Sequence, residues 1–295
     1  MAARQALRAL KSSGPRGMAL AMRDAREERL DRARIARLST SEDGNSSLSD
    51  LGLYPAFCAM AASDDEVFAR FRRSLIYRAI LEHVNYSQGL VHWREFTRRG
   101  LDSQRWRCIL LNDEVGGPCT STYEGLGRVC PSTLSYAKMA ADMFELFGPL
   151  DGMRVAEIGV GYGGQCRVIS HGWDVASYDL FDLPEALALT RRFLETSGMP
   201  ASGYATRDGR EPMAGEYDLV ISNYAFSELQ GDLQERYFER VIKRSPRGYF
   251  IYNHISPGAM QPLTAEDFAA RIPGARILPE YPLTAPGNVL VVWGD

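Results

Sequence analysis

The most informative part of the chain is RVAEIGVGYGGQCRV, residues Arg154–Val168. It begins with a β-branched run typical of a buried strand and continues into a glycine-rich turn and a helix-like segment. A turn of this kind lets the backbone approach a ligand, because glycine has no Cβ, and it directs the amide groups of the following helix towards a crevice. The stretch therefore predicts a small-molecule site at the end of a first strand.

The glycines of this turn fit two patterns. Gly159, Gly161 and Gly164 form G-x-G-x-x-G, in which dinucleotide enzymes hold a pyrophosphate. Gly159, Gly161 and Gly163 form G-x-G-x-G, preceded by the acid Glu157. A carboxylate at that place would repel a pyrophosphate, whereas it would suit the sulfonium cation of S-adenosylmethionine. We therefore predict an S-adenosylmethionine site, with an NAD(P)-dependent oxidoreductase as the alternative.

The chain beyond the first strand alternates between strand-like and helix-like segments. We expect strands at residues 153–160, 174–181, 202–208, 217–223, 247–255, 275–281 and 288–294. The alternation predicts a doubly wound parallel sheet with helices on both faces. The last two strands have no helix between them, so they should form an antiparallel hairpin at the sheet edge. The predicted fold class is therefore α/β, Rossmann-like, as in class I methyltransferases, preceded by a helical N-terminal region.

Three regions are expected along the chain. Residues 1–50 form a basic arm and a polar linker, residues 51–130 a helical cap or substrate region, and residues 131–295 the cofactor-binding domain. The arm resembles a transit peptide at first, but acids soon interleave with its arginines as in a solvated helix. The Gly- and Pro-bearing stretch 111–133 is expected to be a loop. Ser132 or Thr133 should cap the helix that follows it.

Composition excludes some classes of protein. The 295 residues are 45% hydrophobic and 24% charged, with a net charge of −3, which argues against a dedicated nucleic-acid binder. No apolar run approaches the roughly 20 residues of a membrane span. The five cysteines lack a C-x-x-C pair, so we expect a reducing, cytoplasmic location. No set of metal ligands is evident, although nearby acids leave a divalent cation open. A homo-oligomer is also left open.

Four segments in order, EIGVGYGGQ (157–165), FDLPEALAL (181–189), YDLVISNYAFSEL (217–229) and YFERVIKRSPRGYFIYN (237–253), resemble the sugar O-methyltransferases. These are bacterial class I enzymes that use S-adenosylmethionine and release S-adenosylhomocysteine. The resemblance extends over residues 61–258. It implies a small-molecule or glycan acceptor, with a sugar hydroxyl in a polysaccharide, nucleotide sugar or glycosylated metabolite. A non-sugar metabolite and a non-catalytic scaffold are the remaining alternatives.

Acids at strand ends supply the other cofactor candidates. Asp182 directly follows the second strand, where an acid normally binds ribose hydroxyls. Asp179 is the weaker alternative, because it should lie inside that strand. Asp208 follows the third strand and would accept from the adenine amino group, unless it serves a turn with the next glycine. Asn223 ends the fourth strand and is also assigned to the cofactor.

A sugar hydroxyl is a weak nucleophile at neutral pH and needs a base that removes its proton. Glu228 and His254 follow the fourth and fifth strands and are equal candidates for this base. The structural alternatives are that Glu228 only begins a helix and that His254 is a loop residue. Tyr224 is expected to contact the acceptor, and Tyr123 to lie in a lid over it.

Overall fold

The computed structural model describes residues 22, 26, 29–33, 53–100, 105–256 and 258–295. The predicted arm and linker, residues 1–50, lie outside these ranges except for a short helical piece. Within that piece, Asp31 is buried and accepts two hydrogen bonds from the guanidinium of Arg70, at 2.8 and 2.9 Å. This pair joins the N-terminal piece to the described front helices.

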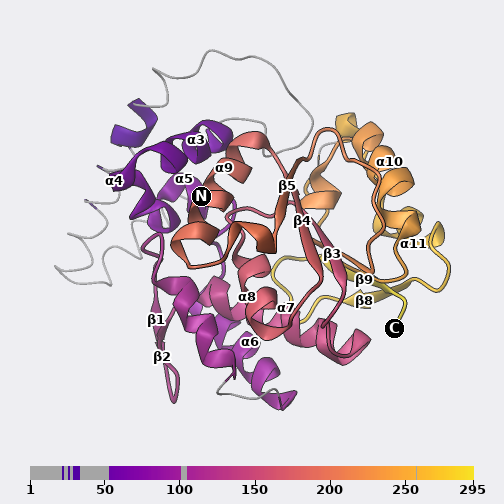
Figure 1. Ribbon diagram of the computed structural model, residues 1–295, viewed down its shortest axis with the longest axis horizontal. Coiled ribbons are helices and arrows are strands. Elements are labelled where there is room, and N and C mark those ends of the chain that lie inside the picture. Colours follow the sequence, from indigo (N-terminus) through magenta and orange to yellow (C-terminus); the bar gives the residue numbers. More distant parts are fainter. Residues whose placement is uncertain (1–21, 23–25, 27–28, 34–52, 101–104, 257) are drawn as a thin grey trace.

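The described elements follow one another as in Figure 1. The front region contains α3 (Tyr54–Ser63), α4 (Asp65–Phe68), η2 (Phe71–Arg73), α5 (Leu75–Arg78), α6 (Tyr86–Arg98), η3 (Arg105–Asp113), β1 (Ser121–Tyr123), β2 (Gly127–Val129) and α7 (Pro131–Phe147). The sheet and its helices are β3 (Arg154–Ile158), α8 (Gly164–Gly172), β4 (Ser177–Asp182), α9 (Pro184–Thr196), η4 (Ala201–Gly203), β5 (Ala205–Asp208), β6 (Leu219–Asn223), η5 (Ala225–Glu228), α10 (Gly231–Arg240), η6 (Ile242–Arg244), β7 (Gly248–Tyr252), η7 (Gly258–Met260), α11 (Ala265–Ala270), β8 (Arg276–Pro279) and β9 (Val289–Trp293).

The main sheet has seven strands in the order β5-β4-β3-β6-β7-β9-β8. Strands β3 to β7 pair in parallel, and β9 is antiparallel to both β7 and β8. The predicted fold class is confirmed, including the antiparallel hairpin at the edge. The chain runs from β3 outward to β4 and β5, then returns to β6 on the other side. This reversal makes the carboxyl ends of β3 and β6 the topological switch point, where ligands bind in open α/β sheets.

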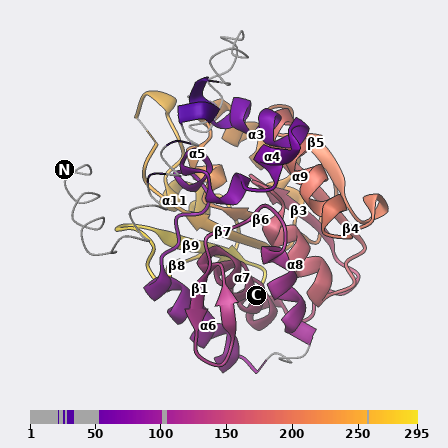
Figure 2. The ribbon, with the colours of Figure 1, turned by 90° about the vertical axis from the view of Figure 1, so that its left-hand side faces the viewer.

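Both faces of the sheet are covered, because successive side chains of a strand point to opposite faces. In β7, Tyr249 and Ile251 pack with α7, α8 and α9, whereas Phe250 and Tyr252 pack with α10 and α11. Figure 1 shows these two groups of helices on either side of the sheet, and Figure 2 views the molecule from the side of the front helices. Strands that are buried on both faces explain the nearly continuous apolar runs in the sequence.

The front helices pack onto the sheet's helices rather than apart from them. Helix α3 packs against α9, and the Phe71 ring lies 5.8 Å from the Tyr162 ring and 6.5 Å from the Phe193 ring, centroid to centroid. The front region and one face of the sheet therefore share a hydrophobic core. This core fixes the front helices over the carboxyl edge of the sheet.

Two local predictions for the front region are wrong. The stretch 111–133 contains the antiparallel hairpin β1–β2 as well as loop. Helix α7 begins at Pro131, with Cys130 as the N-cap, so neither Ser132 nor Thr133 caps it. Proline suits the first helical position because its ring already has a helical φ and the helix does not need its N–H. Thr133 instead donates its hydroxyl hydrogen to Asp113, at 2.6 Å.

Candidate active site

A cavity of about 320 Å³ lies at the carboxyl edge of the sheet. Its floor is formed by the ends of β3, β4 and β6 and by the glycine turn. Three further segments wall it in: residues 79–84 after α5, the first turns of α7, and the β8–β9 loop. Its polar lining residues are Tyr54, His83, Ser132, Ser135, Tyr136, Glu157, Asp182, Arg210, Asn223, Tyr224, Glu228, Tyr237, Asn253, Thr284 and Asn288.

The first two glycines of the turn line the cavity and cannot be replaced without conflict. Gly159 and Gly161 have φ values of 77° and 57°, a region that L side chains rarely adopt. A Cβ on Gly159 would lie 1.9 Å from Cβ of Ala225, and one on Gly161 would lie 2.8 Å from the Leu81 side chain. The absence of a Cβ at these two positions therefore lets the end of β3, the start of η5 and residues 79–84 pack closely around the cavity.

Gly163 and Gly164 serve packing and do not line the cavity. Gly163 is the left-handed N-cap of α8, and a Cβ there would lie 2.8 Å from the Thr190 side chain in α9. A Cβ on Gly164 would lie 2.7 Å from Tyr136 in α7. The third glycine of either sequence pattern thus brings helices together, and the structure does not support the cofactor contact predicted for Gly163.

Asp182 holds the glycine turn in place. It is the last residue of β4, and its Oδ2 accepts hydrogen bonds from the backbone N–H groups of Val160 and Gly161, at 2.8 and 2.9 Å. Its Oδ1 accepts from the N–H of Leu183 at 2.7 Å. The carboxylate also lines the cavity. The acid predicted to bind ribose therefore also holds the backbone of the glycine turn that forms part of the cavity floor.

Asp208 is turned away from the cavity. It ends β5, and its carboxylate accepts from the backbone N–H and the guanidinium of Arg210, at 2.9 to 3.1 Å. These hydrogen bonds hold the pKa of Asp208 below its usual value. Gly209 and Arg210 line the cavity in its place. Asp208 is therefore held by Arg210 and is not among the residues that line the cavity, so its predicted contact with an adenine amino group stays a prediction.

Glu157 lies below the turn with only 2% of its surface exposed. The Tyr178 hydroxyl donates to its Oε2 at 2.7 Å. Burial raises the pKa of Glu157 to about 8, because a carboxylate loses its hydration there. The side chain is therefore largely protonated at neutral pH, and a cation bound in the adjacent cavity would favour its ionised form.

Glu228 and Asn253 form a hydrogen-bonded pair in the part of the cavity beyond β6 and β7. Asn253 Nδ2 donates to Glu228 Oε1 at 2.7 Å, and the Ser227 hydroxyl lies 3.0 Å from Asn253 Oδ1. Burial raises the pKa of Glu228 above its ordinary value, and the hydrogen bond from Asn253 offsets part of the increase. A largely buried carboxylate of raised basicity, fixed by an amide, has the properties of a general base.

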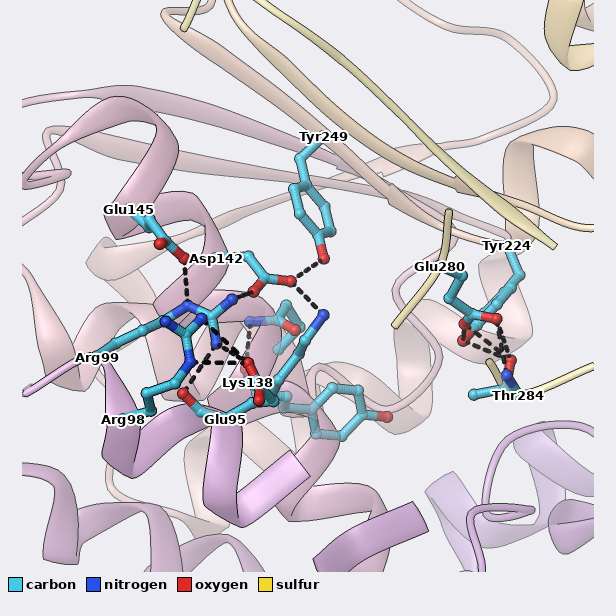
Figure 3. A network of polar contacts seen from close by, with 12 residues as sticks. Glu95, Arg98, Arg99, Lys138, Asp142, Glu145, Tyr224, Tyr249, Glu280 and Thr284 are labelled. Carbon is cyan, nitrogen blue, oxygen red and sulfur yellow. Dashed lines mark hydrogen bonds and ion pairs between the residues drawn. The ribbon is translucent and has the colours of Figure 1, made fainter. Parts of the chain in front are cut away.

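Tyr224 holds the β8–β9 loop against the cavity. Its φ of 72° is rare for a residue other than glycine. Figure 3 shows its hydroxyl and Thr284 converging on the carboxylate of Glu280, with Tyr224 donating at 2.5 Å. Asn288 in turn donates to the Thr284 hydroxyl at 3.0 Å. Tyr224 lines the cavity, and its contact with an acceptor stays a prediction. Its partners on the β8–β9 loop belong to no sequence motif.

His254 and Tyr123 do not line the cavity. His254 is exposed, because its neighbour Asn253 takes the inward position after β7. The histidine on the cavity wall is His83, which the sequence did not single out; its Nδ1 lies 3.2 Å from the carbonyl oxygen of Ile80. Tyr123 is buried in β1 and stacks on Tyr86, with ring centroids 4.9 Å apart. It is a packing residue of the hairpin rather than part of the cavity wall.

No group of three or more His, Cys, Asp or Glu side chains in the described ranges is placed to hold a metal ion. No helix in the same part of the chain is long and apolar enough to cross a membrane.

The strand order, the glycine turn after β3 and the antiparallel edge pair together define an α/β fold like that of Rossmann-like methyltransferases. No protein-family model matches the chain. It is 31% identical over 91 residues to the protein-L-isoaspartate O-methyltransferase of Pyrococcus abyssi (strain GE5 / Orsay). That match covers 30% of this chain and 42% of the relative, so it spans less than half of the relative's length.

Two of the solved structures that resemble part of the chain are named as methylating enzymes. An rRNA methylase from Streptococcus thermophilus is 16% identical, with a TM-score of 0.39, over 54% of this chain and 93% of that one. An S-adenosylmethionine-dependent methyltransferase from Aquifex aeolicus is 16% identical, with a TM-score of 0.38, over 52% of this chain and 87% of that one.

Proposed function

We propose that this chain is an S-adenosylmethionine-dependent O-methyltransferase that acts on a sugar hydroxyl and releases S-adenosylhomocysteine. One observation carries the proposal. A single cavity joins the glycine turn and Asp182 at one end to a half-buried carboxylate, Glu228, that Asn253 orients at the other. A donor held at the first end and an acceptor held at the second would meet between them.

The cavity wall has polar groups suited to such a donor. Among the described residues, Asn223 Oδ1 and Ser132 Oγ are buried and have no hydrogen-bond partner, and both residues line the cavity. Buried polar atoms without partners are rare, so they point to a polar ligand. Asp182 would hold the ribose, Gly209 would lie beside the adenine, and Glu157 would face the cationic part. When bound, S-adenosylmethionine supplies an electrophilic methyl group on a sulfonium.

Glu228 would remove the proton of the acceptor hydroxyl as the new bond to the methyl carbon forms. Its raised pKa makes it a stronger base than an exposed glutamate, and Asn253 keeps one carboxylate oxygen in a fixed position. The remaining work is positioning, because a sulfonium is a good leaving group. Residues 79–84 and the β8–β9 loop cover the cavity and would exclude water from it.

The lining near Glu228 favours an uncharged, hydroxyl-rich acceptor. Asn253, Thr284 and Asn288 offer amide and hydroxyl groups there, and the Tyr224 ring offers an aromatic face. Arg210 is the single Arg or Lys among the residues that line the cavity, and it pairs with Asp208 beyond β5. A phosphate-rich acceptor would need several cationic partners, so this lining also argues against a nucleic acid.

Two measurements test the proposal in order. Isothermal titration should give micromolar dissociation constants for S-adenosylmethionine and S-adenosylhomocysteine, and no binding of NADH or NADPH. The purified chain should then release S-adenosylhomocysteine with one or more acceptors from a panel of glycosides and nucleotide sugars. An isoaspartyl peptide belongs in the panel, because the Pyrococcus relative is named for that acceptor. Binding of NADPH alone would refute the methyltransferase, and turnover of the peptide alone would refute the sugar acceptor.

A further inference from the structure

Helix α7 presents one face and its N-terminus to the cavity. Ser132, Ser135, Tyr136 and Met139 line the wall, and their spacing of three, four and seven residues places them on one face of the helix. The helix has 17 residues, and its N-cap residue, Cys130, makes no side-chain capping hydrogen bond. The amide groups of a helix's first turn point towards its N-terminus and give that end a partial positive charge.

Ser132 is the unusual residue of this turn. Its side chain is almost fully buried, at 2% exposed, and its hydroxyl oxygen has no hydrogen-bond partner among the described residues. Ser135, one turn further along the same face, donates its hydroxyl hydrogen to the carbonyl oxygen of Ser132 at 2.7 Å. The two serines thus share a wall of the cavity, but of the two only the Ser132 hydroxyl lacks a partner within the described part of the chain.

The position of α7 indicates which end of a bound donor it meets. Tyr136 packs against Gly164 at the start of α8, and the Tyr249 hydroxyl in β7 donates to Asp142 in the middle of α7, at 2.8 Å (Figure 3). Helix α7 therefore lies beside the glycine turn and over β7. Asp182 ends β4, on the other side of β3. A donor whose ribose lies at Asp182 and which crosses the glycine turn ends at the first turn of α7.

The donors at this end favour an anion. Two carboxylates lie near the turn, and both are engaged within the protein: Asp113 accepts from the Cys130 N–H at 2.6 Å and from the Thr133 hydroxyl, and Glu82 lies 3.1 Å from the Cys130 sulfur. Arg72 pairs with both of them, and neither carboxylate lines the cavity. The Ser132 side is left with a hydroxyl donor and the positive end of the helix dipole, the arrangement that binds carboxylates and phosphates at helix N-termini.

We propose that Ser132 and the first turn of α7 bind the α-carboxylate of the methionine part of S-adenosylmethionine. The inference rests on the proposed function, and it deepens that function by assigning the carboxylate end of the donor to a helix that precedes the glycine turn. The Ser132 hydroxyl donates one charge-assisted hydrogen bond, and the backbone of the turn supplies the favourable field. An uncharged group at the same place would gain neither contribution.

Three ligands separate this role from a structural one. S-adenosylhomocysteine carries the carboxylate. Decarboxylated S-adenosylmethionine differs from S-adenosylmethionine only in lacking that group, and methylthioadenosine lacks the whole amino-acid part. The wild type should bind S-adenosylhomocysteine more tightly than methylthioadenosine. Ser132→Ala should weaken S-adenosylhomocysteine binding about tenfold or more, in the range of a hydrogen bond to a charged group, and leave the other two ligands unchanged. Ser245→Ala, a control that removes a buried hydroxyl outside the cavity lining, should change none of the three dissociation constants.

The possible results distinguish failure of the inference from failure of the proposed function. Equal weakening of all three ligands by Ser132→Ala would mean a structural role and would overturn the inference. A change in acceptor KM with unchanged S-adenosylhomocysteine affinity would place the serine at the acceptor and overturn it as well. A wild type that binds S-adenosylmethionine and its decarboxylated form equally would refute the carboxylate site alone. A wild type that binds none of these ligands would refute the proposed function.

Discussion

Replacement of Glu228 by glutamine removes the carboxylate and little else. Glutamine has almost the same volume, and its Oε1 can still accept the hydrogen bond that Asn253 Nδ2 now donates at 2.7 Å. The pair should therefore keep its geometry while the side chain loses its capacity to take a proton. If Glu228 is the general base, Glu228→Gln should slow turnover without changing the affinity for S-adenosylhomocysteine.

The magnitude follows from what a positioned base contributes. General-base catalysis typically accelerates a reaction by about 10²- to 10⁴-fold, which corresponds to roughly 2.7 to 5.4 kcal/mol of activation free energy. We expect kcat of Glu228→Gln to fall within this range. A mere loss of packing would be smaller, because the substitution conserves volume and the hydrogen bond.

The pH profile provides an independent signature. Catalysis needs the ionised carboxylate, so kcat/KM should fall as pH falls through the pKa of Glu228. Burial raises that pKa, so the acid limb should lie above the range of an ordinary glutamate. The hydrogen bond from Asn253 lowers the same pKa in part. Asn253→Ala should therefore move the acid limb to higher pH, and Glu228→Gln should abolish it.

The assay is release of S-adenosylhomocysteine across a pH series, combined with titration calorimetry of each variant. His254→Gln is the control, because His254 is exposed and does not line the cavity; its rate should stay within about twofold of the wild type, as expected away from a reaction centre. A Glu228→Gln variant that keeps a tenth or more of the wild-type kcat would refute the reasoning. So would an unchanged acid limb, or a slow His254→Gln variant.

Three further substitutions test the surroundings of the site. Gly159→Ala should abolish S-adenosylhomocysteine binding and lower the free energy of unfolding by about 2 kcal/mol or more, because its positive φ and the 1.9 Å approach to Ala225 both oppose a Cβ. Calorimetry measures the binding and urea unfolding measures the stability. Wild-type values in both measurements would contradict the prediction. The pKa of Glu157, raised to about 8, means that the ligand-free fold binds a proton that the unfolded chain releases near pH 4.5, so stability should decline as pH rises from about 4.5 to 8. Glu157→Gln should flatten that decline in thermal unfolding, and an unchanged slope would show that Glu157 is not its source. Arg72→Met would leave the buried carboxylate of Glu82 without its ion pair and should lower the free energy of unfolding by about 3 to 5 kcal/mol. A loss below 1 kcal/mol would contradict the prediction that the substitution leaves an unpaired buried charge.

The sequence alone predicted the features that depend on local pattern. The strands were recognisable because both of their faces are buried, which leaves β-branched runs such as the one before Gly159. The edge hairpin followed from two such runs without a helix between them. Asp182 was predictable as a cavity residue because it ends a strand, and the carboxyl ends of parallel strands meet at one edge. Glu228 was found for the same reason.

Tertiary structure decided the features that depend on contacts between distant segments or on one-residue differences. His83, Ser132 and Thr284 line the same cavity although about 200 residues separate the first from the last, and no local pattern connects them. Asn253 faces inward and His254 outward because neighbouring side chains after a strand point in opposite directions, and only packing determines which of the two enters the cavity. The same holds for Gly163, which packs against α9 and does not line the cavity. A glycine motif in the sequence indicates that there is no room for a Cβ, but only the folded chain shows which neighbour takes that room.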